Sequence, residues 1–252
     1  QADQSIEDDL KAQGVRYAKI GKVTQGEELI LTHLGQTYRF NIPELRDVWY
    51  LTSYLLDKQQ TANDKATERY QNYSEQPLQY TFPAHFTGEK PVRPQGKRPV
   101  AAVIREKGSN SEREMANALY LAGFDVKDVH TTDLTSGRET LEDVRFIGAV
   151  GGFSNSDVLG SAKGWAGALL YNEKAKKALD NFFARPDTLS VGICNGCQLF
   201  MELELINPEH SEHGKMKHND SHKHETGFVS VTIPENNSVM LSSLAGTTLG
   251  VW

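Results

Sequence analysis

Short apolar runs that alternate with helical patterns constrain the fold of residues 98–200 more than any other feature of this sequence. The run VAAVI (100–104) is continuously apolar, which is typical of a parallel strand buried on both faces. Three further segments predict strands: FDVKDVH (124–130), FIGAVGG (146–152) and LSVGIC (189–194). Because strands that alternate with helices form parallel sheets with right-handed crossovers, the expected fold class is α/β with a doubly wound parallel sheet.

The segments between and after these strands predict three helices. Ser111 and Glu114 have the spacing of a capping box, which would open a helix that Gly123 closes. A long amphipathic helix is expected over 164–185, and the apolar segment CQLFMELEL predicts a short helix after the fourth strand. A polar, His-rich stretch follows, and FVSVTIP (228–234) then predicts another strand.

Residues 1–57 are expected to form a separate, small α+β segment. VRYAKIGKV (15–23) and EELILTHLGQTYRFNI (27–42) predict strands, and a helix is predicted from Pro43 onward. Two or three strands with one helix make a thin layer, so this segment is not expected to be complete by itself.

The composition changes at residue 58. Gln, Asn, Ser, Glu and Lys dominate first and prolines follow, which is typical of a linker, with one polar helix expected near 60–73. The chain is therefore expected to comprise the segment 1–57, a linker over 58–97 and a domain over 98–252.

The composition also narrows the functional class. Lys and Arg are scattered and the net charge is −6, so no nucleic-acid-binding face is expected. No apolar run approaches the roughly 20 residues that a membrane span needs. The polar N-terminus lacks the apolar core of a secretory signal, and two cysteines cannot form a disulfide framework. A cytoplasmic protein without a membrane partner is expected.

Cys194 is the residue that most clearly points to chemistry. The sequence Gly192-Ile193-Cys194-Asn195-Gly196 lies where a buried strand meets a helix, which is the arrangement of a nucleophile elbow with Cys in place of Ser. Side chains at the flanking positions would clash in so tight a turn, which explains the glycines. The helix N-terminus favours the reactive thiolate, and the backbone N–H of Asn195 is expected to stabilise an oxyanion.

Three other interpretations of Cys194 remain open at this point. It could be a structural cysteine at a strand end, or it could form a C-x-x-C redox pair with Cys197. The spacing Cys194-x2-Cys197-x15-His213-x4-His218 also formally satisfies a zinc site, although a zinc finger places its cysteines on a hairpin. The five histidines between residues 210 and 224 are expected to lie in a solvated loop, and no metal site is predicted.

A glycine pair, Gly151-Gly152, follows the third strand. Such a pair can be only a tight turn. Alternatively, it leaves room for backbone N–H groups to point at a substrate oxygen. Loops at the carboxyl ends of neighbouring strands meet at one site in a doubly wound sheet, so this loop is a candidate second oxyanion donor.

Two segments together resemble the glutaminase domain of formylglycinamide ribonucleotide amidotransferases (phosphoribosylformylglycinamidine synthases), which are class I (Cys-His-Glu) glutamine amidotransferases. They are GGFSNSDVLGSAKGWAGALLYNE (151–173) and RPDTLSVGICNGCQLF (185–200). Residues 100–126 resemble the start of the same domain. HNDSHKHETGF (218–228) resembles a segment of the form R-N-x-S-x-x-F-E, from which it departs at two histidines.

The resemblance extends to residues 1–57, which are similar to the tail of the aminoimidazole ribonucleotide synthetase-like domain in the same family. The W-x-x-T-S-Y pattern from Trp49 to Tyr54 carries this part. The implied fold is a flavodoxin-like doubly wound parallel sheet preceded by a small α+β segment.

The resemblance implies a reaction in two parts. A glutaminase releases ammonia from glutamine through a γ-glutamyl thioester on Cys194, and a synthetase uses ATP to install that ammonia on formylglycinamide ribonucleotide in purine biosynthesis. By motif, N–H groups at Gly152 or Phe153 and at Asn195 would hold the oxyanion. The substrate contacts implied are Gln198, Asn219 and Ser221, and Cys197 is expected to pack beneath the elbow.

The same resemblance sets expectations about partners and completeness. The partners implied are glutamine and the remaining synthetase domain, with ATP and Mg in the intact enzyme and no cofactor in this piece. The family takes its catalytic His and Glu from an H-G-E-G motif that does not occur in these 252 residues, so the chain is expected to be a fragment of the ligase with little activity. The rival hypotheses are a stand-alone amidase with a Cys elbow and a C-x-x-C redox or interaction module.

Overall fold

The structure is a computed structural model that describes residues 4–75, 79–89, 92, 95–206 and 208–251. The chain divides into two compact units. The first runs to Thr81 and also includes Asn219–Ile233 and the residues from Thr248 onward. The second comprises Phe82–His218 and Pro234–Thr247.

The second unit is built on a four-stranded parallel sheet with the order β5-β3-β6-β8. Its strands are β3 (Val100–Arg105), β5 (Asp125–His130), β6 (Val144–Ala149) and β8 (Leu189–Gly192). In chain order this is 2-1-3-4, which agrees with the first four strands of the flavodoxin-like order. The predicted α/β fold class with parallel strands is therefore confirmed.

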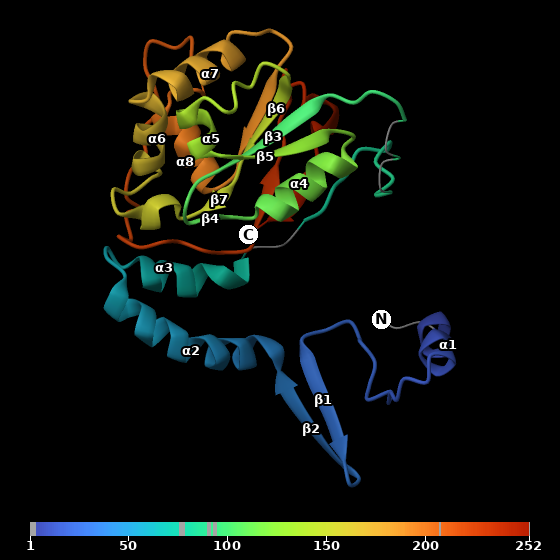
Figure 1. Cartoon of the computed structure of the whole chain (residues 1–252). Helices are drawn as coiled ribbons and strands as arrows, with labels where there is room; N and C mark the ends of the chain where they lie inside the picture. The colour runs from blue at the N-terminus through green and yellow to red at the C-terminus, as the bar shows by residue number, and fades with distance from the viewer. Residues whose placement is uncertain (1–3, 76–78, 90–91, 93–94, 207, 252) are drawn as a thin grey trace. The chain divides into compact units, whose positions relative to one another are not determined.

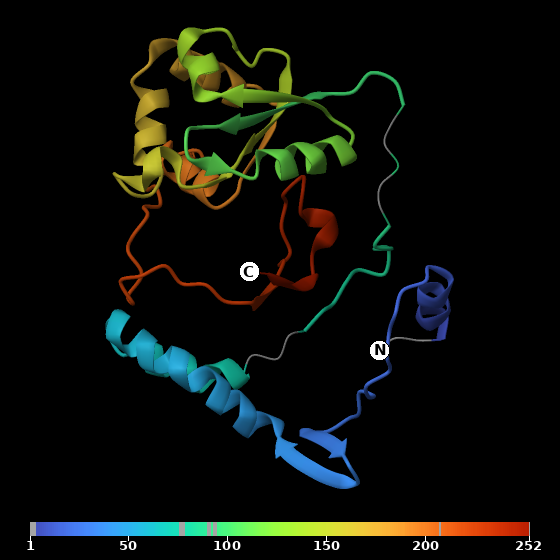
Figure 2. The ribbon, with the colours of Figure 1, turned by 60° about the horizontal axis from the view of Figure 1, so that its bottom comes forward.

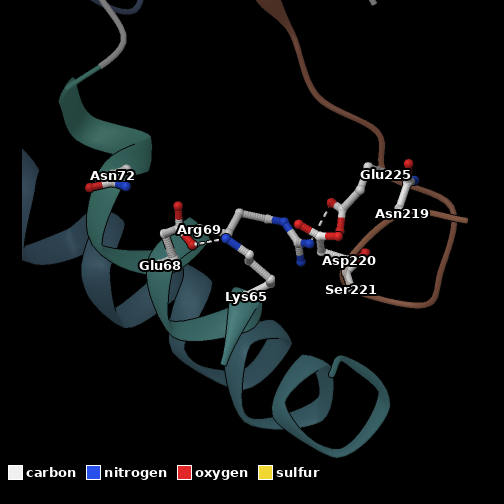
Figure 3. A pocket seen from close by; sticks show the side chains of 8 residues that line it. All are labelled: Lys65, Glu68, Arg69, Asn72, Asn219, Asp220, Ser221 and Glu225. Carbon is white, nitrogen blue, oxygen red and sulfur yellow. Dashed lines mark hydrogen bonds and ion pairs between the residues drawn. The ribbon is translucent and has the colours of Figure 1, made fainter. Parts of the chain in front are cut away.

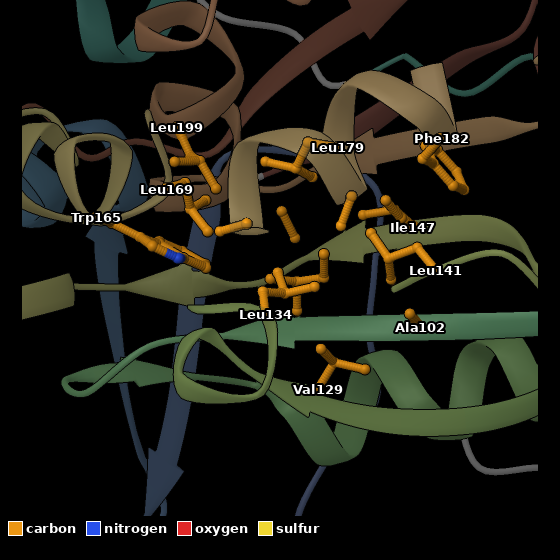
Figure 4. Close-up of a cluster of buried hydrophobic side chains, with 14 of the residues drawn as sticks. Ala102, Val129, Leu134, Leu141, Ile147, Trp165, Leu169, Leu179, Phe182 and Leu199 are labelled. Carbon is orange, nitrogen blue, oxygen red and sulfur yellow. The ribbon is translucent and has the colours of Figure 1, made fainter. Parts of the chain in front are cut away.

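Helices cover both faces of this sheet (Figures 1 and 2). On one face lies α4 (Glu112–Leu121), and on the other lie α5 (Thr131–Ser136), α6 (Lys163–Leu170), α7 (Glu173–Phe183) and α8 (Asn195–Glu202). Alternate residues of β3 serve the two faces, because successive strand side chains point to opposite sides. Ala101 and Val103 pack in the cluster under α4, whereas Ala102 and Ile104 pack in the larger cluster (Figure 4).

The larger cluster contains most of the large, fully buried side chains of the unit. Trp165 of α6, Phe182 of α7 and Leu199 of α8 meet Leu134 and Ile147 there. The long amphipathic helix expected over 164–185 is wrong, because the segment forms two helices that break at Tyr171 and Asn172. The side chain of Asn172 accepts the backbone N–H groups of Lys174 and Ala175, so it caps a new helix rather than continuing the first one.

Two local features of this unit also differ from expectation. The helix predicted after Ser111 is present, but Ser111 has a φ of 69° and its side chain makes no cap hydrogen bond, so the capping box is wrong. Helix α5 was not expected. His130 caps it, and the carboxylate of Asp133 accepts the N–H of His130 in return.

The second unit also contains four short elements. Strand β7 (Gly151–Gly152) pairs in antiparallel fashion with β4 (Ser109–Asn110). The 3-10 turns η2 (Ser154–Asp157) and η3 (Ser242–Leu244) complete the unit.

The first unit contains a hairpin followed by two helices. Strands β1 (Glu28–His33) and β2 (Gln36–Asn41) pair in antiparallel fashion around Leu34 and Gly35, as predicted. The remaining elements are α1 (Gln4–Ala12), α2 (Ile42–Gln60), α3 (Lys65–Asn72), η1 (Tyr73–Glu75), β9 (Val229–Thr232) and β10 (Thr248–Val251). The strand predicted over 15–23 is wrong, since those residues form no regular structure.

The aromatic side chains of α2 and α3 hold these two helices together. Tyr54 stacks on Tyr70 with a centroid distance of 4.3 Å, and Tyr50 lies 4.7 Å from Tyr73. Asn41 caps α2 by accepting the N–H of Glu44. In the described part of the chain, no helix combines the length and apolar character that crossing a membrane requires.

Leu134 offers a direct test of the larger cluster. It is 0% exposed, so Leu134→Ala should lower the free energy of unfolding by about 2–5 kcal/mol through lost burial and a residual cavity. The matched control is Leu159→Ala in the same unit, where the side chain is 66% exposed and the change should be within about 0.5 kcal/mol. Urea unfolding measures both, and equal losses would contradict the packing described here.

Candidate active site

Cys194 occupies the junction between β8 and α8. Strand β8 ends at Gly192 and α8 begins at Asn195, so Cys194 is the N-cap residue of the helix. Its backbone has φ 54° and ψ −110°, a conformation that side-chain-bearing residues rarely adopt. Its carbonyl accepts the N–H of Gln198 at 3.0 Å, and the thiol is exposed. The geometry is that of an exposed thiol on a tight strand–helix turn.

Backbone contacts explain both glycines of this turn. A Cβ on Gly192 would lie 2.5 Å from the carbonyl oxygen of Gly196, and a Cβ on Gly196 would lie 2.2 Å from the carbonyl oxygen of Ala149. Atoms do not approach so closely, so neither position accepts a side chain. The elbow is therefore pressed against the end of β6.

The glycine pair after β6 lies beside the thiol. A Cβ on Gly151 would be 3.3 Å from Cβ of Cys194 and 3.9 Å from its Sγ. Gly152 has a φ of 103°, and a Cβ there would meet the backbone nitrogen of Asn110 at 2.7 Å. The backbone N–H of Phe153 donates to the carbonyl of Gly108 at 3.0 Å. The structure thus brings Gly151 beside the thiol of Cys194, whereas Gly152 lies against β4.

The side chain of Asn195 joins the two loops. It is 1% exposed, its Oδ1 accepts the backbone N–H of Ser154 at 3.1 Å, and its Nδ2 donates to Oε1 of Gln198 at 2.8 Å. Sequence reasoning assigned a role only to the backbone N–H of Asn195 and missed this function of the side chain. The partner lies 41 positions earlier in the chain, so no local pattern could have revealed it.

Cys197 does not pack beneath the elbow as expected. It lies in the first turn of α8, three positions after Cys194, and it is exposed. The buried positions of that helix belong instead to Asn195, Gly196, Leu199 and Phe200. Both thiols of the chain are therefore free and face solvent.

Asn219 and Ser221, which were predicted to contact substrate, belong to the first compact unit, whereas Cys194 belongs to the second. They line a cavity of about 360 Å³ that also includes Lys65, Arg69 and Glu225 (Figure 3). Hydrogen bonding by Ser221 and the positive charge of Arg69 lower the pKa of Glu225. Ser221 is buried, and Asn219 donates to the carbonyl of Lys223 at 2.9 Å.

The described residues form no cluster of histidine and acidic side chains at the thiol. Within the described ranges, no hydrogen bond reaches the sulfur of Cys194, and no three His, Cys, Asp or Glu side chains lie close enough together to hold a metal ion. His213 lies 3.8 Å from Glu204, and His210 and Glu212 are exposed in the loop after α8.

Comparisons with known proteins agree on one family. Residues 98–252 match the family described as CobB/CobQ-like glutamine amidotransferase domain. The probable phosphoribosylformylglycinamidine synthase, chloroplastic/mitochondrial, of Arabidopsis thaliana is 38% identical over 262 residues, covering 98% of this chain. The phosphoribosylformylglycinamidine synthase of Homo sapiens is 39% identical over 227 residues, covering 84%. This chain spans 18% and 17% of those two relatives' lengths.

Among solved structures, the chain is similar to one described as the structure of PurLQS from Thermotoga maritima. It is 24% identical, has a TM-score of 0.45, and the similarity covers 62% of this chain and 66% of that chain.

Gly196 provides a test of the elbow. We expect Gly196→Ala to destabilise the second unit by at least about 2 kcal/mol, because the added Cβ overlaps the carbonyl of Ala149. Gly167→Ala is the matched control, since that helical glycine has only the Tyr171 ring near its added Cβ, at 3.8 Å, and should gain up to about 1 kcal/mol. Urea denaturation compares the two, and a neutral Gly196→Ala would refute the close approach.

Asn195 provides a second test. We expect Asn195→Ala to cost about 1–3 kcal/mol of unfolding free energy, because it leaves the N–H of Ser154 without its acceptor. Asn195→Asp keeps that acceptor but loses the N–H donor to Gln198. A carboxylate oxygen would then face Oε1 of Gln198, so this variant should also lower the free energy of unfolding. Thermal unfolding would show both losses, with Asn172→Ala at the half-buried cap of α7 as the comparison for an amide outside the elbow. A loss for Asn195→Ala no larger than that of Asn172→Ala would count against the buried link.

Proposed function

Because the chain belongs to the CobB/CobQ-like glutamine amidotransferase family, we propose that residues 98–252 are the glutaminase part of a phosphoribosylformylglycinamidine synthase. The observation that carries this proposal is the exposed thiol of Cys194 on a strand–helix elbow beside the Gly151-Gly152 loop. A redox or structural cysteine would not need the two glycines that this turn demands.

In the proposed reaction the sulfur of Cys194 attacks the side-chain amide carbon of glutamine. A carbon–sulfur bond forms and the carbonyl oxygen becomes an oxyanion. The tetrahedral adduct then expels the amide nitrogen as ammonia and leaves a γ-glutamyl thioester. Water attacks the thioester, releases glutamate and restores the thiol.

Two backbone N–H groups are the proposed oxyanion donors. The N–H of Asn195 begins α8, directly after the nucleophile. Between Gly152 and Phe153 the contacts favour Gly152, because Phe153 already donates to Gly108. In an antiparallel ladder, hydrogen-bonded pairs alternate with pairs that are not hydrogen-bonded. Phe153 is bonded to Gly108, so the next pair, Gly152 opposite Ser109, is not hydrogen-bonded, and the N–H of Gly152 is directed away from β4.

The proposed substrate contacts are Gln198, Asn219 and Ser221. The Oε1 of Gln198 is occupied by Asn195, which leaves its amide N–H groups to donate to a substrate. The assignment of Asn219 and Ser221 rests on the motif alone.

No histidine is hydrogen-bonded to the thiol in the described part of the chain, so we propose that this chain by itself turns over glutamine slowly. A general base would normally take the thiol proton and return it to the leaving ammonia. The ammonia would serve a synthetase partner that uses ATP and Mg to amidate formylglycinamide ribonucleotide, and a cytoplasmic location fits that role.

Covalent labelling tests the nucleophile. A glutamine-like diazoketone should modify one site, Cys194, and free glutamine should slow the reaction. Cys194→Ala should abolish labelling, whereas Cys197→Ala should retain it, although both thiols are exposed. Peptide mass spectrometry identifies the site.

The same experiment separates the rival hypotheses. Labelling of both cysteines at equal rates, unaffected by glutamine, would exclude a glutamine site. A reversible disulfide between Cys194 and Cys197 without diazoketone labelling would favour the redox module. Labelling that any amide slows equally well would favour a stand-alone amidase.

A further inference from the structure

A second cavity lies in the same unit as the elbow, under the loop between β7 and α6. It has a volume of about 240 Å³. Its polar lining residues are Ser154, Asn155, Asp157 and Lys163, and its apolar rim includes Val158 and Leu159.

Two buried oxygens that line this cavity have no hydrogen-bond partner among the described residues. They are Oγ of Ser154, a residue only 2% exposed, and Oδ1 of Asp157. Buried polar atoms are nearly always paired, because an unpaired one loses its interactions with water and gains nothing in return. A buried hydroxyl and a buried carboxylate oxygen on one small cavity therefore mark a site for a polar ligand.

The chemistry of these atoms indicates a cationic donor. A carboxylate only accepts hydrogen bonds, and a hydroxyl can accept as well as donate. A small ion with several N–H groups satisfies both, and its charge compensates that of Asp157. Lys163 also lines the cavity, but its side chain is exposed and no ion pair joins it to Asp157 in the described part of the chain.

Ser154, which lines the cavity, links it to the elbow that carries Cys194. Ser154 donates its backbone N–H to the side chain of Asn195, which directly follows Cys194. A Cβ added to the nearby Gly151 would lie 3.9 Å from the sulfur. The segment that forms this cavity is thus held against the elbow that carries the sulfur.

We propose that the cavity lined by Ser154, Asp157 and Lys163 is an ammonium-binding site. Ser154 Oγ and Asp157 Oδ1 accept N–H groups of the ion, and water completes its shell. The assignment of a small cation with N–H groups as the ligand rests on these two oxygen atoms alone. The further step, that the ion is the ammonia released at Cys194, rests on the proposed glutaminase function.

The site is tested by titrating the ¹⁵N-labelled chain with ammonium chloride at constant ionic strength. The backbone amide of Ser154 should shift saturably, and sodium or tetramethylammonium chloride should not reproduce the shift. Asp157→Asn should weaken binding about tenfold or more, because the carboxylate supplies the charge. The matched control is Asp180→Asn on the exposed face of α7, which should bind as the wild type does.

Further variants separate the competing explanations. Ser154→Ala should weaken binding, and Lys163→Met should bind at least as tightly as the wild type, since it removes a neighbouring positive charge. Loss of binding in Lys163→Met would overturn the assignment. Equal responses of wild type and Asp157→Asn would also overturn it and would leave ordered water as the occupant of the cavity.

Cys194→Ala distinguishes the site from the proposed function. This variant should bind ammonium as the wild type does, because no contact to the ion involves sulfur. If the wild-type chain binds ammonium but does not react with the glutamine-like diazoketone, the ammonium site is retained and the glutaminase function is rejected. Labelling of Cys194 without ammonium binding would reject the site alone.

Discussion

The close approach of the β8–α8 elbow to the end of β6 is the constraint on which the candidate site depends. Gly196 rests against the carbonyl of Ala149, and the same carbonyl accepts the N–H of Ile193 at 3.1 Å. The carbonyl of Ala149 thus contacts the turn both before and after Cys194. The contact forces Cys194 into its unusual backbone conformation and brings it beside the Gly151-Gly152 loop. Strain of this kind persists only where the surrounding structure determines it.

The two central strands of the sheet were predictable because they are buried on both faces. Val100–Arg105 and Val144–Ala149 are nearly continuous apolar runs, and such runs between helices have few alternative arrangements. The segment 15–23 alternates polar and apolar residues as a half-buried strand does, but a strand forms only when a neighbour pairs with it, and no described residue does so here. The break between α6 and α7 was missed because the amphipathic pattern continues across Asn172, whose capping role depends on its backbone conformation.

The site was predictable to the extent that it depends on the local turn. Gly192 is required by a contact with Gly196 in the same turn, and the spacing of these two glycines indicated the elbow, whereas the contact that requires Gly196 comes from Ala149, on a strand far earlier in the chain. The buried amide of Asn195 and the unpaired oxygen of Ser154 depend on a loop that arrives from elsewhere in the chain. Sequence spacing contains no information about that meeting, and the two cavities were likewise invisible to it.

The two roles of Asn195 illustrate how a compact site separates structure from chemistry. Its side chain joins Ser154 to Gln198, which fixes the first turn of α8 and the loop after β7 in one arrangement. In the proposed mechanism the backbone N–H of the same residue donates to the oxyanion, and the two side-chain bonds hold it in place. An oxyanion donor is effective when it does not have to reorganise during the reaction. The buried amide is therefore the feature that would convert a strand–helix turn with an exposed thiol into a rigid site.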